Sequence, residues 1–517
     1  MTASMWIVVG VLIYAAFMVI QGMSSYKSVS GSESEFYQAG KGVGSFVLLC
    51  TTAISVFSGL SYYGYPAAIY RDGVGFYSGT GGYICGLLFV VLGYRLWLLG
   101  KEYGFMTPAD FLRERYYSEG YGMFVAVLLT FFIVPYVALQ LIAVGNGMEL
   151  TTKGLVPYVV AVAIGTICVS LHIIGGGMKS VAWLDTFHFL LGIGSLLIII
   201  TYLIAVYFPE GGLVEAANKV ASNPDLEKIL SHPGPRGTYT WKGTLGTALS
   251  GAVVTIVWPH IFSRCYIARS KDSFKFMAWG LPFAYVIVFG MLAIIGAILA
   301  PALMGPGLEK PDNIMPLLAT EYCHPIIAFV SLLCLFAFAV STADSMLLSA
   351  SAMASRDLYI HHKFERRGLA ADAAGAVRFG RIVLLVLLVG TIGICAMKPI
   401  AIVDYAYKLS SPMFAMIFPA TIGGLFWRKG TREGAWAGTV GGFLVTVLFT
   451  FFMTPPLGFS NIVWGLVVNT VLYVGVSLCT KCPEHIVEKF IDRIDSMIAS
   501  KTDSDEATDQ AVSASRG

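Results

Sequence analysis

The chain has 517 residues, of which 56% are hydrophobic and only 13% are charged, and its formal net charge is +3. This composition excludes an ordinary water-soluble domain and gives no basic footprint for nucleic acid, whereas repeated apolar runs of about 20 residues indicate one polytopic helical bundle in a lipid bilayer. Cys479 and Cys482 form a lone CxxC pair without the second pair that a zinc site needs.

About thirteen membrane spans are predicted from the apolar runs between charged or Gly/Pro-rich breaks. The first run, from Met5 to Ile20, lacks a basic leader and a cleavage site, so we interpret it as a retained helix and not as a signal peptide. The expected spans lie near residues 5–23, 45–70, 76–98, 119–148, 155–173, 181–207, 243–263, 277–304, 323–350, 380–397, 400–427, 434–454 and 460–479.

Basic residues are concentrated in alternate loops, as in the cluster Arg264, Arg269, Lys271 and Lys275. Because basic loops stay in the cytoplasm, this alternation predicts an N-terminus outside and a C-terminus inside. We therefore expect a multi-pass protein of the cell membrane, plasma or inner. The sequence does not indicate an oligomeric state.

Two spans carry the signs of a broken helix. Thr51–Pro66 combines several Ser and Thr with two Gly and a Pro, which predicts an interruption near Ser58–Gly59. The span at 243–263 repeats this character before Trp258–His260. Broken helices at corresponding positions are typical of transporters with inverted repeats, although ordinary Gly/Pro kinks remain an alternative.

The repeat hypothesis divides the chain into six segments, because spans 2–6 would match spans 7–11. They are an extra N-terminal helix with a loop at 1–44, a first repeat at 45–207, an external loop at 208–242, a second repeat at 243–427, two peripheral helices at 428–479 and a cytoplasmic tail at 480–517.

A polar cluster interrupts the long apolar run from Ile326 to Ala352. Ser341, Asp344 and Ser345 are spaced i, i+3 and i+4, so they share one helix face. A carboxylate inside a membrane needs a partner, and hard oxygen donors suit an alkali cation. The hydroxyls could instead bond back to carbonyls of their own helix. The working hypothesis is a cation site.

Other charged residues lie within or beside spans. Asp185 and His188 are predicted in the cytoplasmic part of the sixth span. Asp404 and Lys408 are spaced i, i+4 near the outer end of the eleventh span, where they would form a structural ion pair or an external gate. Arg264 is expected to end the seventh span at the cytoplasmic face, as an anchor or a gate.

Several blocks of the sequence resemble the sodium:solute symporter family. They are Gly104–Tyr116, Gly175–Asp185, Trp258–Ser270, Ser341–Tyr359 and Phe426–Gly438, and they occur in the family's order over nearly the whole chain. The resemblance implies an all-α leucine-transporter-type fold with a 5+5 inverted repeat, which agrees with the two broken spans.

The resemblance also implies cation sites. The family's common sodium site would use the backbone carbonyls of Ile54, Phe57 and Phe338 and the hydroxyls of Ser341 and Thr342. Some relatives, such as sialic acid symporters, look to hold a second sodium deeper in the bundle. The corresponding positions here are Asp185, Ser341, Asp344 and Ser345, and the carboxylate at Asp344 departs from that pattern. Two carboxylates near one pocket require a second sodium or a proton between them.

The substrate is expected at mid-membrane against the broken second span. The half-helix that begins after the break would offer free N–H groups and the positive end of its dipole to an anion. The candidate substrate residues, each of which could also be core packing, are Ser58, Gly59, Ser61, Tyr62, Tyr65, Gln140 and Trp258.

These observations predict a sodium-coupled symporter of a small organic anion, such as a monocarboxylate or a pantothenate-like solute, with one or two sodium ions. The alternatives are proton or dual-cation coupling to an amino acid, sialic acid or sugar, and a channel or sensor on the same scaffold. An enzyme is not expected, because no catalytic constellation appears.

Overall fold

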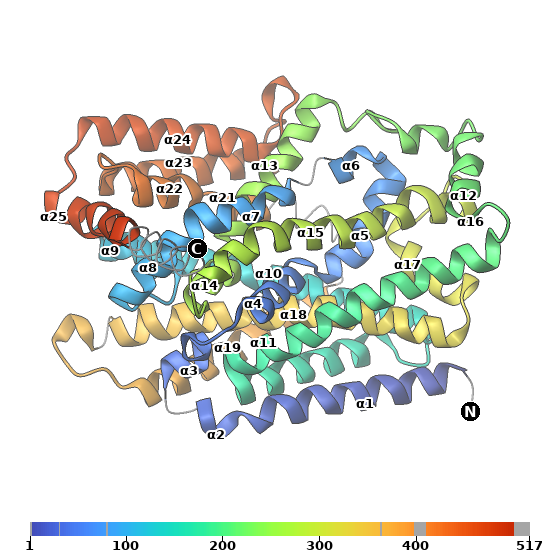
Figure 1. Cartoon of the computed structure of the whole chain (residues 1–517), viewed down its shortest axis with the longest axis horizontal. Helices are drawn as coiled ribbons and strands as arrows, with labels where there is room; N and C mark the ends of the chain where they lie inside the picture. Colours follow the sequence, from blue (N-terminus) through green and yellow to red (C-terminus); the bar gives the residue numbers. More distant parts are fainter. Residues whose placement is uncertain (1–2, 30–31, 79–80, 362–363, 398–409, 501–517) are drawn as a thin grey trace, which may run out of the picture.

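The structure, a computed structural model, describes residues 3–29, 32–78, 81–361, 364–397 and 410–500. Within these ranges the chain is helical, and the only strand-like pairing is an isolated bridge between Val43 and Ala268. Long helices run nearly side by side in one bundle (Figure 1). Because a helix satisfies its own backbone hydrogen bonds, this is the arrangement that an apolar surrounding permits.

Nine helices are long and apolar enough to cross a membrane, and two bent helix pairs in the described residues could bring the number to eleven. The long helices are α1 (Ala3–Ser24), α10 (Glu119–Thr151), α11 (Tyr158–Tyr207), α15 (Asp272–Ile294), α18 (Pro325–Met353), α19 (Ala373–Ala396), α23 (Arg432–Phe451) and α24 (Asn461–Cys479). A ninth span combines α7 (Cys85–Leu88) with α8 (Tyr94–Tyr103), which a π-helical turn joins.

Shorter helices connect these spans. They are α2 (Tyr26–Val29), α3 (Glu33–Gln38), α6 (Gly75–Ser78), α9 (Pro108–Arg115), α12 (Gly212–Ala221), α16 (Ala300–Met304), α17 (Ile314–Leu317), α21 (Ser411–Ala415), α22 (Phe418–Phe426) and α25 (Glu484–Val487).

Helix α11 contains the two spans expected at 155–173 and 181–207. Its backbone leaves the helical region at Gly177, where φ is 55° and ψ is −156°. A positive φ is accessible to glycine because it has no Cβ. The structure thus has two helices here, 158–176 and 178–207, joined at a sharp break at Gly177 in place of the loop that the sequence pattern predicted. Ser180 Oγ lies 2.9 Å from His172 Nε2, which shows that the chain turns back at this break.

The two bent pairs lie where the sequence predicted broken helices. Helix α4 (Ser45–Val56) meets α5 (Gly59–Asp72) at 57°, and α13 (Trp241–Val257) meets α14 (Pro259–Ile267) at 48°. Pro259 lacks a backbone N–H, so the second helix cannot continue its hydrogen-bond ladder through this point. Both breaks therefore take backbone groups out of the helical hydrogen-bond ladder inside the bundle, where other groups can bond with them.

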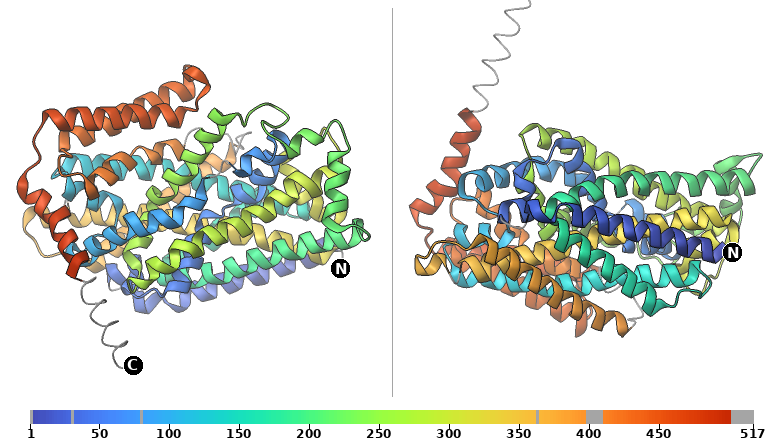
Figure 2. Two further views of the ribbon diagram at one scale, coloured as in Figure 1. Left: turned by 45° about the horizontal axis from the view of Figure 1, so that its top comes forward. Right: turned by 90° about the horizontal axis from the view of Figure 1, so that it is seen from below.

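The peripheral helices lie on opposite flanks of the bundle. Helix α1 runs along one side and the α23–α24 pair along the other, with α18 between them (Figures 1 and 2). Helix α18 packs against α4, α10 and α11, and α11 also packs against α1. Every residue of α18 from Cys334 to Met353 is buried. The polar residues of α18 are consequently enclosed by other helices.

Candidate functional site

The break between α4 and α5 is built by its own serines. Phe57 and Ser58 have extended backbones, and Ser58 is the N-cap of α5. The Ser61 N–H donates to Ser58 Oγ at 3.3 Å, and the Ser58 N–H donates to Ser61 Oγ at 3.2 Å. This reciprocal capping box holds the start of α5 in place.

Gln140 secures the same break from α10. The Gly59 N–H donates to Gln140 Oε1 at 2.8 Å, and the Gln140 side chain is fully buried. The N–H groups of Gly59 and Ser61 are thus already satisfied, which corrects the expectation that they are free for an anion. The positive end of the α5 dipole remains near the break.

Thr342 links α18 to the end of α4. Its hydroxyl lies 3.2 Å from the Ser55 carbonyl oxygen and 3.0 Å from the Phe338 carbonyl oxygen. The ring of Phe338 also packs on that of Phe57, with centroids 6.0 Å apart. Ile54 and Phe57, whose carbonyls were expected as ligands, lie in the last turn of α4 and at the break. These oxygen donors are of the type that an alkali cation accepts.

Ser341 faces a different neighbour. Its hydroxyl lies 2.7 Å from His188 Nδ1 on α11, and His188 Nε2 in turn hydrogen-bonds the Tyr14 hydroxyl on α1. The structure therefore brings Thr342 and the α4 break together, whereas the Ser341 hydroxyl is held towards α11.

The guanidinium of Arg264 lies between Asp185 and Ser345. Arg264 Nη2 lies 3.1 Å from Asp185 Oδ2 and 2.7 Å from Ser345 Oγ, and its side chain is fully buried. Arg264 was expected to be an anchor or a gate at the cytoplasmic face, and its burial inside the bundle corrects the anchor alternative. The Thr51 hydroxyl also donates to Asp185 Oδ2 at 2.5 Å.

Asp344 has partners of its own. Its Oδ2 lies 2.5 Å from His172 Nδ1, and His172 Nε2 lies 3.0 Å from Gln21 Oε1 and 2.9 Å from Ser180 Oγ. The sequence hypothesis placed Asp344 and Asp185 around one cation, but each carboxylate has a separate hydrogen-bonding set in the structure. Asp344 bonds with a histidine of the first half of α11, while Asp185 lies in the second half.

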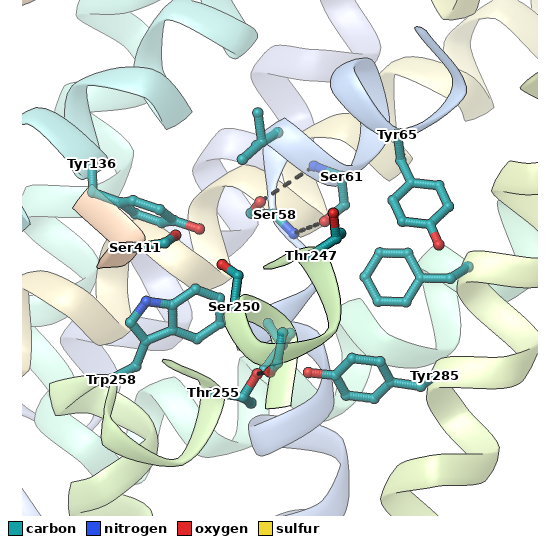
Figure 3. A pocket seen from close by; sticks show the side chains of 14 residues that line it. Ser58, Ser61, Tyr65, Tyr136, Thr247, Ser250, Thr255, Trp258, Tyr285 and Ser411 are labelled. Atoms are coloured by element: carbon teal, nitrogen blue, oxygen red, sulfur yellow. Dashed lines mark hydrogen bonds between the residues drawn. The ribbon is translucent and has the colours of Figure 1, made fainter. Parts of the chain in front are cut away.

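A narrow pocket adjoins the break (Figure 3). Its free volume is about 60 Å³, well below the roughly 300–1,000 Å³ of pockets that hold drug-sized ligands, so a bound solute requires its walls to move. Nine of the fourteen lining residues carry a hydroxyl group, and none of the lining residues is charged. They are Val56, Ser58, Leu60, Ser61, Tyr65, Tyr136, Thr247, Ser250, Gly251, Thr255, Trp258, Tyr285, Phe289 and Ser411.

Four of the seven predicted substrate residues line this pocket: Ser58, Ser61, Tyr65 and Trp258. The other three predicted residues form hydrogen bonds between helices and do not line the pocket. Gly59 and Gln140 bond with each other, and the Tyr62 hydroxyl bonds with Ser331 on α18. Trp258 is the most notable of the lining residues, since its buried indole N–H has no hydrogen-bond partner within the described part of the chain.

Sequence reasoning missed the wall that α13 contributes. Thr247, Ser250 and Thr255 come from α13, and Figure 3 shows Thr247 and Ser250 towards the serines of α5 and Thr255 farther along the pocket, near Tyr285. Their spacing of i, i+3 and i+8 puts them on one helix face, which is a signal that the sequence contains. Tyr136, Tyr285 and Ser411 come from three other helices and have no comparable pattern.

A larger cavity of about 430 Å³ shares Thr247 and Ser250 with the narrow pocket. It extends to Arg71, Asp72 and Arg236, which lie on the side predicted to face outward. Asp72 is paired with Arg71 at 2.7 Å and lies 3.8 Å from Arg236. The predicted external gate, Asp404 and Lys408, lies outside the described residues.

A buried ionic cluster on the opposite side connects α9 with the π-helical segment Ala354–His361, which continues α18. The Arg113 guanidinium lies 2.7 Å from Asp110 and 2.7 Å from Asp357. Thr107, the N-cap of α9, also donates to Asp357 at 3.2 Å. All four side chains are buried. These ion pairs and the Thr107 hydrogen bond link the two helical segments through buried side chains.

Comparison with known proteins gives consistent matches. The model of the sodium:solute symporter family matches residues 36–442. A sodium/pantothenate symporter of Haemophilus influenzae is 25% identical over 495 residues, covering 93% of this chain and 98% of the relative. A sodium/proline symporter of Staphylococcus aureus is 23% identical over 505 residues, covering 95% of this chain and 96% of the relative.

The fold also matches solved transporters. A sodium-coupled sialic acid symporter in a substrate-bound outward-open state superposes with a TM-score of 0.78 at 15% identity, covering 93% of this chain and 98% of that one. A nucleobase-cation-symport-1 family transporter in a closed conformation superposes with a TM-score of 0.56 at 12% identity, covering 89% of this chain and 98% of that one. The leucine-transporter-type fold predicted from the sequence is confirmed.

Proposed function

Because the chain belongs to the sodium:solute symporter family, we propose that it imports a small organic carboxylate together with sodium, by alternating access in the cell membrane. The observation that carries the sodium proposal is the contact of Thr342 with the Ser55 carbonyl at 3.2 Å, beside the broken helix. A cation here would bind oxygens of both α4 and α18. It would thereby stabilise the arrangement in which these helices are packed together.

The two curated relatives support a carboxylate. Pantothenate and proline, the solutes in their names, both carry a carboxylate group. In this chain the α5 dipole and the Trp258 indole N–H are the features that favour a negative group in the pocket. The hydroxyls of Ser250, Thr255 and Ser411 would suit the polar remainder of a solute such as pantothenate.

The cavities support an outward-facing arrangement. The larger cavity adjoins the narrow pocket from the predicted outer side, and the two share Thr247 and Ser250. On the predicted inner side, the buried ion pairs of Arg264 and Arg113 hold the helices together. Sodium and solute would bind from outside, and release would follow once these inner contacts separate. Coupling arises because each ligand binds one arrangement better than the other.

Uptake by purified protein in liposomes tests this function. Labelled pantothenate, proline and short monocarboxylates are offered under an inward sodium gradient, with potassium replacing sodium in one arm and a pH gradient without sodium in another. We expect concentrative uptake of one carboxylate only with sodium. Equal uptake without sodium would contradict the proposal, and uptake driven by the pH gradient alone would establish proton coupling instead.

A further inference from the structure

The guanidinium of Arg264 occupies an oxygen cage inside the bundle. Its Nη2 atom lies 2.6 Å from Ser55 Oγ, 2.7 Å from Ser345 Oγ, 2.9 Å from Thr51 Oγ1 and 3.1 Å from Asp185 Oδ2. These oxygens come from α4, α18 and α11, whereas Arg264 comes from α14. One positively charged nitrogen thus has four oxygens around it.

The cage has the chemistry of an alkali-cation site. It consists of one carboxylate and three hydroxyls, which are hard oxygen donors without a histidine or cysteine among them. A carboxylate inside a membrane requires a positive partner, and Arg264 supplies it to Asp185. A mobile cation in the same place would lie in contact with the guanidinium, where like charges in a poorly solvated interior repel strongly.

The remaining donors of Arg264 fix its position. Arg264 Nε lies 3.2 Å from Thr51 Oγ1, and Nη1 donates to the His260 carbonyl at 2.9 Å. The second bond joins the guanidinium to its own helix one turn earlier. All three nitrogens of the guanidinium therefore have oxygen partners, and the bond to His260 ties the charge to α14.

We propose that Arg264 is a built-in second cation, which fills the inner cage permanently and limits the coupling of this transporter to one sodium ion, bound at the Thr342 site. This inference rests on the proposed sodium coupling. In this proposal the Asp185 carboxylate neutralises the guanidinium of Arg264. It does not bind and release a sodium ion during transport.

The wild-type protein provides the first test. Labelled sodium binding to the purified protein and the reversal potential of transport in liposomes both report the number of sodium ions per solute. We expect one. Two sodium ions per solute would overturn the inference and leave the proposed symport intact, whereas a complete lack of sodium stimulation would overturn the proposed function itself.

Substitution provides the second test. Arg264→Gln removes the tethered charge, and we expect an additional sodium to bind beside Asp185, so that the Hill coefficient for sodium rises from about 1 towards 2. Arg264→Lys keeps a positive charge and is expected to keep the single-ion behaviour. Arg269→Gln, at an exposed position just beyond α14, is the matched control.

An unchanged sodium dependence in folded Arg264→Gln would show that Arg264 is only a structural contact, which contradicts the inference. Thermal unfolding of each variant, recorded with and without sodium, establishes whether it is folded. Should Arg264→Gln fail to fold, the stoichiometry of the wild-type protein still decides the question.

Discussion

The hydroxyl of Thr342 lies 3.2 Å from the carbonyl oxygen of Ser55, so one side chain of α18 contacts the last turn of α4 just before its break. The two residues are separated by 287 positions in the sequence. In an all-helical bundle most carbonyls are already bonded within their own helix, and a carbonyl near a break is one of the few that remains accessible to another group.

Thr342→Val is predicted to weaken sodium activation, because it removes a ligand oxygen while nearly preserving the shape of the side chain. A polar contact to a charged group contributes about 1.5–3 kcal/mol, which corresponds to a roughly ten- to hundredfold higher sodium concentration for half-maximal uptake. Uptake measured as a function of sodium concentration checks this. Thr342→Ser, which keeps the hydroxyl, should remain close to wild type.

The matched control is Thr166→Val on α11. Thr166 is also buried, and the one bond of its hydroxyl within the described residues goes back to the Val162 carbonyl of its own helix, at 2.8 Å. Sodium activation of this variant should not change. An equal loss in both variants would mean that the effect comes from helix packing and not from a sodium ligand.

Trp258→Phe is predicted to weaken solute binding without changing sodium activation. The substitution keeps an aromatic ring against Tyr136, whose ring centroid lies 6.0 Å away, but removes the indole N–H that the described protein atoms leave unbonded. Loss of one hydrogen bond to a charged group should raise KM about tenfold or more. Trp279→Phe on α15, where the side chain is 62% exposed, should leave KM unchanged.

Gly59→Ala is predicted to impair transport and stability. A Cβ at this position would lie 2.9 Å from the Ala143 Cβ and 3.3 Å from the Ala339 Cβ, so α5 would have to move away from α10 and α18. Overpacking of this kind costs about 1–3 kcal/mol. The unfolding temperature and the initial uptake rate should both fall. Gly194→Ala on α11 has open space around the new Cβ and should affect neither.

The sequence was sufficient to predict the broken helices and part of the site. Local chemistry determines these features, because the serines of Ser58–Ser61 cap a helix and Pro259 cannot continue one. The polar face of α18 was likewise visible as a spacing of hydroxyls in an apolar run, and the structure places Thr342 beside the α4 break.

Pairings between distant helices were not predictable from one sequence. The spacing of Asp344 and Ser345 indicated a shared face, but it contained no information about which helix would meet each residue. Asp344 meets His172, and Ser345 meets Arg264 from α14. The rotation of each helix and the reach of a long arginine side chain decide such contacts, and both depend on the packing of the whole bundle.

Arg113→Met is predicted to destabilise the protein strongly, because Arg113 is the partner that Asp110 and Asp357 share at 2.7 Å each, and the side chains of all three are at most 5% exposed. Removing one partner of a buried ionic contact costs about 3–5 kcal/mol, since it leaves uncompensated charge. A large fall in the unfolding temperature in detergent checks this expectation.

Lys275→Met is the control for that experiment. The pair of Lys275 and Asp272 is 3.8 Å apart, and both side chains are more than two-thirds exposed at 75% and 68%. Exposed ion pairs contribute about 0–1 kcal/mol, so this variant should unfold at the wild-type temperature. Equal stability of the two variants would show that the Arg113 cluster is solvated and does not hold α9 against the segment Ala354–His361.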